Sequence, residues 1–382
     1  DDATADGVDV INYSVSGSST SIAGPDEIAF LFAADAGIFV STSAGNSGDT
    51  VGESSVAHNA PWTMTVAAST HNRGALNSLT LGNDETYDGV GYGGPLESTP
   101  MELGENLAAD GVDTAEADLC APGSLDDTET AGMLVVCTRG AYALVDKAQE
   151  VIDSGGAGMV LVNDPAGAGG QNAIIYGLPA THLLADDGVA VKAYVESTDN
   201  PTGSISATTP TEVNAPVMAS FSSYGPALAG GGDLLKPDIT APGVDVAAAY
   251  HPNPADPTEP GFDQISGTSM SAPHIAGLGA LLKQEYPEWS PMAIKSAMMT
   301  TARDTDDSGG PIQRGGSDAS PLDYGAGEVV PREFYNPGLV YDSGLGDWAA
   351  YACVLQPRVR GPGPDRRQRP ELPEHLDRCV GG

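Results

Sequence analysis

Apolar and polar positions over the first 83 residues alternate between short strand-like runs and one helical segment. Residues 8–13 begin an apolar run, and "IFVSTSAGNSG" and "WTMTVAAST" form two further runs of strand length. Between the first two runs, "PDEIAFLFAADAG" places Ile28, Leu31 and Phe32 at helical spacing before a glycine stop signal. Strands and a helix of these lengths predict parallel strands that are joined by right-handed crossovers.

The pattern changes from residue 85 to residue 213. Glycine and acidic residues become more frequent, and "GMLVVCTRG" and "GAGMVLVND" indicate buried strands around the helix "ALVDKAQEVIDSGG". From residue 214 the first pattern returns. We therefore predict a first domain that is interrupted by a second, in the order 1–84, 85–213 and 214–350. Residues 351–382 are rich in arginine and proline. We favour out-of-frame or chimeric sequence over a genuine basic tail as their interpretation, and we assign them no function.

The chain is strongly acidic, with 52 acidic and 16 basic residues and a formal net charge of −36. Such a charge repels phosphate backbones and anionic membranes, so nucleic-acid binding is not expected. No apolar run reaches the length of about 18 residues that a membrane span needs. The acidity fits either a highly soluble protein or a secreted protein from saline surroundings. No signal peptide precedes the first strand, which predicts that the sequence begins at an internal cut.

The segment "GTSMSAPHIAG" places Ser269 at the beginning of a helix. A nucleophilic serine needs a base, a site for the oxyanion and a fixed direction. The main-chain N–H of Ser269 and the positive end of the helix dipole can supply part of that site. In "STSAGNSG", Asn46 follows a strand, and its amide can donate to the same oxyanion. A capping serine and a turn asparagine are the simpler alternatives.

Several motifs together resemble the subtilisin-like serine proteases, or subtilases. They are "GTSMSAPHIAG", "SAGNSG", "VINYSVSG" and "LLKPDITAPGVDV". Three others, "FSSYGP", "APWTMTVAAST" and "DYGAGEVVPREFYNPGLVYD", resemble the large subtilases that carry an inserted protease-associated domain. The resemblance implies an α/β fold, a subtilisin-like parallel sheet with helices on both faces, interrupted by an inserted α+β protease-associated domain. It also implies a secreted, extracellular endopeptidase that acts on proteins or peptides.

The resemblance assigns roles residue by residue. Ser269 matches the nucleophile and Asn46 the oxyanion-hole side chain. The bond between Ala60 and Pro61 matches a peptide bond that is cis in the family. Two backbone segments match those that bind the substrate as an added strand, namely Ser14, Val15, Ser16 and Gly17, and Ser43, Ala44 and Gly45.

The chain departs from the family at the other two catalytic motifs. The family's aspartate and histidine motifs precede the first strand, and neither lies before Val8. None of the six histidines has the expected context, and these are His58, His71, His182, His251, His274 and His375. We therefore predict that the parent protein is an endopeptidase and that this chain is inactive alone. The alternative is a non-catalytic protein that binds peptides on a protease scaffold. An unrelated hydrolase is disfavoured because "GTSMSAP" lacks the Gly-x-Ser-x-Gly elbow.

The predicted insert contains Cys120 and Cys137. In a secreted protein we favour a disulfide between them over two buried thiols, and closing such a loop stabilises a fold by about 3 kcal/mol. The chemistry requires no cofactor. Calcium is common in the family, but no ligand spacing here supports a site. Metal ligands, oligomeric state and substrate preference stay unassigned.

Overall fold

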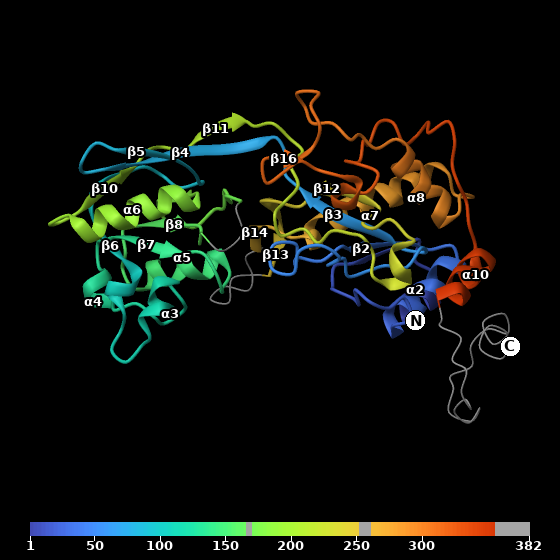
Figure 1. The fold of residues 1–382 in the computed structure, drawn as a ribbon, viewed down its shortest axis with the longest axis horizontal. Coiled ribbons are helices and arrows are strands. Elements are labelled where there is room, and N and C mark those ends of the chain that lie inside the picture. Colours follow the sequence, from blue (N-terminus) through green and yellow to red (C-terminus); the bar gives the residue numbers. More distant parts are fainter. Residues whose placement is uncertain (166–169, 252–260, 356–382) are drawn as a thin grey trace. The chain divides into compact units, whose positions relative to one another are not determined.

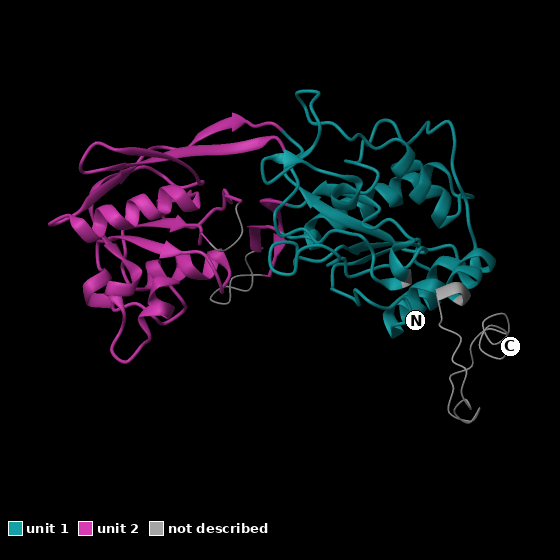
Figure 2. Ribbon diagram, viewed as in Figure 1, with its two compact units in different colours: residues 1–70, 215–243, 267–382 teal, residues 71–214, 244–266 magenta. Residues whose placement is uncertain are grey.

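The computed structural model describes residues 1–165, 170–251 and 261–355. These residues form two compact units, which Figure 2 shows in different colours. Unit 1 comprises residues 1–70, 215–243 and 267–382, and unit 2 comprises residues 71–214 and 244–266. Residues 356–382, which make up most of the predicted tail, lie outside the described part of the chain.

Unit 1 is built on a parallel sheet with the order β1-β2-β3-β12 (Figure 1). Its strands are β1 (Val10–Tyr13), β2 (Phe39–Ser43), β3 (Met64–Ser69) and β12 (Ile239–Pro242). Every residue of β2 and β3 is buried. Burial on both faces is typical of parallel sheets, and it explains why these strands appear as apolar runs rather than as alternating patterns.

Helices cover both faces of this sheet. Phe39, Met64 and Ile239 pack against α7 (Thr268–Glu285) and α8 (Pro291–Thr300). On the other face, Val40 and Trp62 pack with apolar residues of α2 (Pro25–Asp35). The predicted α/β class with a parallel sheet is confirmed. The remaining short elements of the unit are α1 (Asp2–Ala5), η2 (Ala229–Gly232), β15 (Gln313–Arg314), β16 (Ser317–Asp318), α9 (Pro321–Tyr324) and α10 (Leu345–Leu355).

The long helix α7 lies very close to β2. A Cβ atom on Gly279 would lie only 2.5 Å from Cδ1 of Phe39, so a larger residue at this position would push the helix away from the sheet. The close contact fixes the beginning of α7 relative to the carboxyl ends of the strands. Ser269 lies in the first turn of this helix.

Unit 2 contains an eight-stranded sheet with the order β10-β6-β7-β8-β9-β5-β4-β11, in which β10 also pairs with β4. Strands β6 to β9 run parallel, and the other pairings are antiparallel. The bounds are β4 (Arg73–Leu81), β5 (Thr86–Val90), β6 (Leu96–Leu103), β7 (Leu134–Thr138), β8 (Gly158–Val162), β9 (Ala180–Leu183), β10 (Thr202–Ile205) and β11 (Thr209–Glu212).

Two helices pack against the parallel part of this sheet. Ala148 and Val151 of α5 (Leu144–Asp153) contact one buried cluster, and Val191 of α6 (Ala185–Ser197) contacts another. The other elements of the unit are η1 (Gly104–Leu107), α3 (Thr114–Asp118), α4 (Asp127–Thr130), β13 (Val246–Tyr250) and β14 (Gly261–Ile265).

The compact unit differs in extent from the predicted insert 85–213. It begins at His71, because β4 pairs with β5, β10 and β11 and therefore belongs to the same sheet. It also includes residues 244–266, which contribute the β13–β14 hairpin. The identity of this unit as a protease-associated domain stays a prediction.

The expected cis bond between Ala60 and Pro61 is wrong. Cis X–Pro bonds occur instead at Ala215–Pro216, Gly225–Pro226 and Lys236–Pro237. Ala60 is fully buried in the same cluster as Trp62. The contacts around it give no physical reason for the difference.

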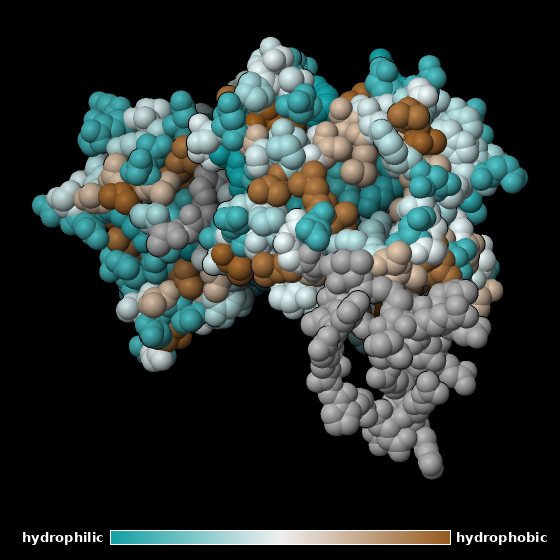
Figure 3. Space-filling model, turned by 45° about the vertical axis from the view of Figure 1, so that its right-hand side comes forward, coloured by the Kyte–Doolittle hydropathy of each residue, from teal (hydrophilic) through white to brown (hydrophobic). Residues whose placement is uncertain are grey.

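Hydrophilic side chains dominate the face of the molecule seen in Figure 3, and the apolar residues there form small separate groups. Within the described residues, no helix combines the length and the apolar character that crossing a bilayer would require.

Candidate active site

Gly267 and Thr268 bring Ser269 to the beginning of α7. The N–H of Gly267 donates to the carbonyl of Gly243 at 2.8 Å, and the carbonyl of Gly267 accepts from Met270 at 2.9 Å. Ser269 is half-buried, and Thr268 is completely buried. The N–H groups of a first helical turn have no acceptor four residues earlier, and the helix dipole makes this end partly positive. The N–H of Ser269 is therefore suited to binding a developing negative charge.

Asn46 is held against this turn by its side-chain oxygen. Oδ1 of Asn46 accepts from the main-chain nitrogen of Thr268 at 2.9 Å and from its hydroxyl at 2.8 Å. The Thr268 hydroxyl in turn accepts from the N–H of Gly45 at 3.1 Å. Because the main-chain nitrogen can only donate, these bonds fix which end of the amide faces the helix. Sequence analysis did not identify Thr268, although its position directly before the candidate nucleophile was an available signal.

The amide nitrogen of Asn46 and the N–H of Ser269 border the same small volume. A Cβ atom placed on Gly267 would lie 3.3 Å from Nδ2 of Asn46 and 3.6 Å from the nitrogen of Ser269. The Sδ atom of Met270 lies 3.5 Å from the same position. Two N–H donors that lie near each other beside a candidate nucleophile are the groups that an oxyanion hole requires.

The hydroxyl of Ser269 lies against the end of β1. Its Oγ donates to the carbonyl of Ser14 at 3.3 Å, and Oγ of Ser14 donates to the carbonyl of Ser269 at 2.8 Å. The following residues Val15 and Ser16 are exposed, with 55 % of Val15 accessible to solvent. The segment from Ser14 to Gly17 therefore leads away from the candidate nucleophile along an accessible edge.

The second predicted segment, Ser43 to Gly45, is buried, and its main chain is already paired within unit 1. The N–H of Ala44 donates to Val66 at 2.9 Å, and the carbonyls of Ala44 and Gly45 accept from Ala57 and Ser223. Gly45 has φ +105°, a conformation that favours glycine. This segment can therefore form a wall of the site, whereas the segment from Ser14 to Gly17 is exposed to solvent at Val15 and Ser16.

Within the described part of the chain, Ser269 makes no hydrogen bond to a histidine. His58 is buried beside Glu27, and His274 contacts the carbonyl of Met270 on its own helix. In unit 2, His71 contacts the carbonyl of Asp245. His182 lies between Asn163 and Asn172, and burial lowers its pKa to about 3. His251 also belongs to unit 2, and His375 lies outside the described residues.

No group of three or more histidine, cysteine, aspartate or glutamate side chains suited to a metal ion occurs in residues 1–165, 170–251 and 261–355.

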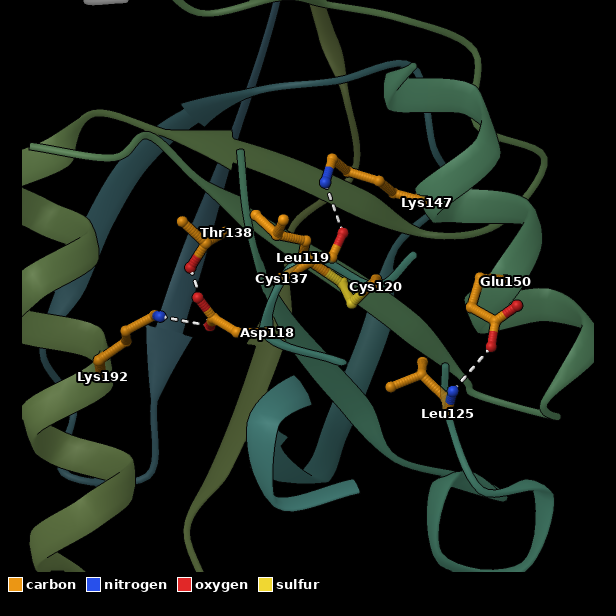
Figure 4. Close-up of a disulfide and its surroundings, with 9 residues drawn as sticks. All are labelled: Asp118, Leu119, Cys120, Leu125, Cys137, Thr138, Lys147, Glu150 and Lys192. Atoms are coloured by element: carbon orange, nitrogen blue, oxygen red, sulfur yellow. Dashed lines mark hydrogen bonds and ion pairs between the residues drawn. A yellow bond between two sulfur atoms is a disulfide. The ribbon is translucent and has the colours of Figure 1, made fainter. Parts of the chain in front are cut away.

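A disulfide joins Cys120 to Cys137 in unit 2, with a Cα–Cα distance of 5.6 Å (Figure 4). Hydrogen bonds and an ion pair also hold the residues next to the two cysteines. Asp118 accepts from the hydroxyl of Thr138 at 2.9 Å and pairs with Lys192 at 2.6 Å, as Figure 4 shows. The ammonium group of Lys147 donates to the carbonyl of Leu119, and burial lowers the pKa of Lys147 to about 8.

Comparison with known proteins shows the family of the chain. Residues 1–327 match the Subtilase family, and the chain belongs to that family. It is 43 % identical over 378 residues to the subtilisin-like protease SBT5.3 of Arabidopsis thaliana, covering 93 % of this chain and 47 % of the relative. It is 40 % identical to SBT5.4 of the same plant, with 92 % and 47 % covered. The chain thus spans about half the length of these relatives. Among solved structures, the psychrophilic subtilisin-like protease Apa1 from the Antarctic psychrotroph Pseudoalteromonas sp. AS-11 matches with 15 % identity and a TM-score of 0.34, covering 87 % of this chain and 70 % of that one.

Proposed function

We propose that this chain is part of a serine endopeptidase that hydrolyses peptide bonds through an acyl-enzyme on Ser269. The observation that carries the proposal is that Asn46 Nδ2 and the Ser269 nitrogen both lie close to Gly267, 3.3 and 3.6 Å from the position of a Cβ atom on that residue. Oγ of Ser269 attacks the peptide carbonyl, and the two donors bind the oxyanion. The amine leaves with a proton, and water then hydrolyses the ester.

The base for Ser269 and the carboxylate that orients it come, in this proposal, from a segment outside residues 1–382. The hydroxyl of Ser269 donates to the carbonyl of Ser14, which cannot accept a proton for catalysis. A serine hydroxyl without a neighbouring base is a weak nucleophile. The chain alone is therefore proposed to be inactive.

We propose that the substrate is an extended peptide, which pairs with the exposed segment from Ser14 to Gly17 as an added strand. Ser43 to Gly45 form the opposite wall. The main-chain pairing supports affinity for any extended peptide, and the walls select its side chains. No cofactor takes part in this chemistry.

We also propose that the protein is secreted and that unit 2 is a protease-associated domain. The acidic composition and the Cys120–Cys137 disulfide support an oxidising, extracellular location. The mixed sheet of unit 2, with α5 and α6 packed against its parallel strands, supports an α+β insert.

The second candidate is a non-catalytic protein that binds peptides on the same scaffold. It is favoured by one observation, which is that no described histidine is hydrogen-bonded to Ser269. In that case the open edge at Ser14 to Gly17 would bind peptides without cleaving them.

The test compares the chain of residues 1–382 with a version extended by the upstream coding sequence. Both lengths are prepared without a substitution, with Ser269→Ala and with Ser317→Ala. Each protein is then treated with a fluorophosphonate probe and, separately, with a chromogenic peptide. Ser317 is an exposed serine of β16 and serves as the matched control. We expect labelling and hydrolysis only in the extended protein, abolished by Ser269→Ala and unchanged by Ser317→Ala.

Robust hydrolysis by residues 1–382, abolished by Ser269→Ala, would show that a base for Ser269 lies within this chain. Hydrolysis by the extended protein that survives Ser269→Ala would refute the proposed nucleophile. An extended protein that binds peptides but neither labels nor hydrolyses would establish the non-catalytic candidate.

A further inference from the structure

His58 is buried in unit 1 between two acceptors. Its Nδ1 lies 2.7 Å from Oε1 of Glu27, and its Nε2 lies 2.8 Å from the carbonyl oxygen of Val15. The side chains of His58 and Glu27 are both completely shielded from solvent. A carboxylate and a carbonyl can only accept, so both ring nitrogens must donate. With Glu27 ionised, this geometry requires the charged imidazolium form, because a protonated Glu27 could itself donate to Nδ1.

The imidazole ring lies directly beneath the candidate substrate-binding segment. A Cβ atom on Gly17 would lie 2.5 Å from Cε1 and 2.7 Å from Nδ1 of His58, so only glycine allows this contact. The carbonyl of Val15 is tied to the ring, while the side chain of Val15 is exposed. The ring thus supports the main chain of residues 15–17 from the buried side.

The residues on either side of His58 hold neighbouring main chain. The N–H of Ala57 donates to the carbonyl of Ala44 at 2.8 Å. The amide of Asn59 donates to the carbonyls of Ser18 and Ser19 at 3.2 and 3.1 Å. One short loop, residues 57–59, therefore connects both segments that are proposed to border the substrate.

We propose that His58 is a positioning residue for substrate binding. Its imidazolium, paired with Glu27, holds the main chain of residues 15–17 in the conformation that accepts a peptide as an added strand. This inference rests on the proposed function, because it concerns the peptide-binding edge of the same site.

The surroundings of His58 favour the charged ring. Burial opposes the charge, but the hydrogen bonds to Glu27 and Val15 and the charges of Glu27 and Asp26 together raise the pKa of His58 above its ordinary value. Both carboxylates belong to α2. The ring of Tyr13 in β1 lies 5.7 Å away, and Lys236 lies close enough for the charge of Glu27 to affect its pKa.

Deprotonation has a definite structural consequence. A neutral imidazole has one N–H, which cannot serve both acceptors. Oε2 of Glu27 has no hydrogen-bond partner among the described residues, so this buried carboxylate depends on His58 for compensation and retains the proton on Nδ1. The carbonyl of Val15 then loses its donor. Peptide binding should weaken as the pH rises through the pKa of His58.

The test measures binding, so it does not depend on hydrolysis. The chain of residues 1–382 carrying Ser269→Ala is titrated with acetyl-Ala-Ala-Pro-Phe-amide and with acetyl-Phe-amide by NMR from pH 5.5 to 9. Neither probe has a titratable group. The longer probe can pair with residues 15–17, and the shorter one reaches only the position next to Ser269. The variants are His58→Leu, His58→Gln, Glu27→Gln and the exposed control His274→Gln.

We expect His58→Leu to weaken binding of the longer probe about five- to tenfold and to leave the shorter probe unchanged. His58→Gln, which keeps a donor without the charge, should restore part of this loss and remove the pH dependence. In the chain that keeps His58, the dissociation constant of the longer probe should rise with pH. Its midpoint should equal the midpoint of the NMR shift changes of the imidazole protons. His274→Gln should leave the dissociation constants of both probes, and their pH dependence, unchanged.

Equal weakening of both probes would overturn the inference, because a general loss of folded structure affects them alike. So would an unchanged affinity for the longer probe, a flat pH profile with His58 in place, or no peptide binding at all. If His58→Leu fails to fold by circular dichroism, Glu27→Gln and His58→Gln decide the question. The proposed function is tested separately by covalent labelling of Ser269, so either idea can fail alone.

Discussion

Asn46 and Thr268 are joined by two hydrogen bonds that share one acceptor, Oδ1 of Asn46. One donor is the main-chain nitrogen of Thr268, and the other is its hydroxyl. Because Oδ1 faces Thr268, Nδ2 of Asn46 is the end of the amide left to donate, and it lies 3.3 Å from the position of a Cβ atom on Gly267. A buried threonine thus orients the amide that is proposed to bind the oxyanion.

This relationship predicts the effect of Thr268→Val in the extended protein, which is proposed to be active. Valine keeps the shape and the main-chain bond but removes the hydroxyl bond, so we expect kcat to fall about tenfold with little change in KM. Asn46→Ala should cost about 10²- to 10³-fold, the loss that accompanies removal of this donor in subtilisin, a member of the same family. Steady-state kinetics on a chromogenic peptide measure both. A Thr268→Val enzyme with unchanged kcat would show that the main-chain bond alone orients Asn46.

Asp238 forms a buried ionic cluster with two lysines, and its loss should destabilise unit 1. Its carboxylate lies 2.7 Å from Nζ of Lys236 and 2.8 Å from Nζ of Lys295. It also accepts from the N–H of Thr65 in β3 at 2.7 Å. Asp238→Asn leaves two buried ammonium groups without compensation, and we expect a loss of about 3 to 5 kcal/mol in the free energy of unfolding.

Urea unfolding checks this expectation, with the exposed Asp233→Asn as the control. Burial alone would raise the pKa of Asp238, but Lys236 and Lys295 hold it below its ordinary value. The stabilisation is therefore complete above the pKa of the unfolded chain and is lost as the pH falls through the lower folded pKa. Equal stability of the two variants at pH 7 would contradict the role of the cluster.

Local sequence patterns could predict the elements around Ser269 but not the contacts that cross the fold. The strand runs, the helix beginning at Thr268 and the loop of Asn46 each have signals within a few residues. His58 and Glu27 are 31 positions apart, and nothing in either segment indicates that they pair. Likewise, β4 lies within residues 1–84, which are predicted as the first part of the first domain, although its strand partners come from unit 2.

The disulfide between Cys120 and Cys137 should stabilise unit 2 through its loop. Replacing both cysteines by alanine releases 16 intervening residues in the unfolded chain, and we expect a loss of about 3 kcal/mol. Hydrogen exchange should then accelerate in β7 and α3, which the bond connects, while β2 and β3 of unit 1 stay protected. Thiol labelling of the unfolded, unreduced chain provides the check on pairing, and reaction of Cys120 or Cys137 would contradict it.

Glu328 should make the folded protein less stable as the pH rises toward 8. Its carboxyl group is 7 % exposed and accepts from the hydroxyl of Ser69 at 2.7 Å. Burial raises the pKa of Glu328 to about 8, although the bond from Ser69 and the charge of Arg303 oppose this shift.

Between the ordinary pKa of a glutamate and about 8, the folded state therefore holds a proton that the unfolded state has released. By linkage, the free energy of unfolding falls with rising pH across this window and levels off above it. Glu328→Gln resembles the protonated form, so we expect it to remove this slope and to exceed the unsubstituted protein by roughly 5 kcal/mol at pH 9. Urea denaturation from pH 4 to 9, with the exposed Glu333→Gln as control, measures the difference. Parallel pH profiles for the two variants would mean that Glu328 is ionised in the folded state.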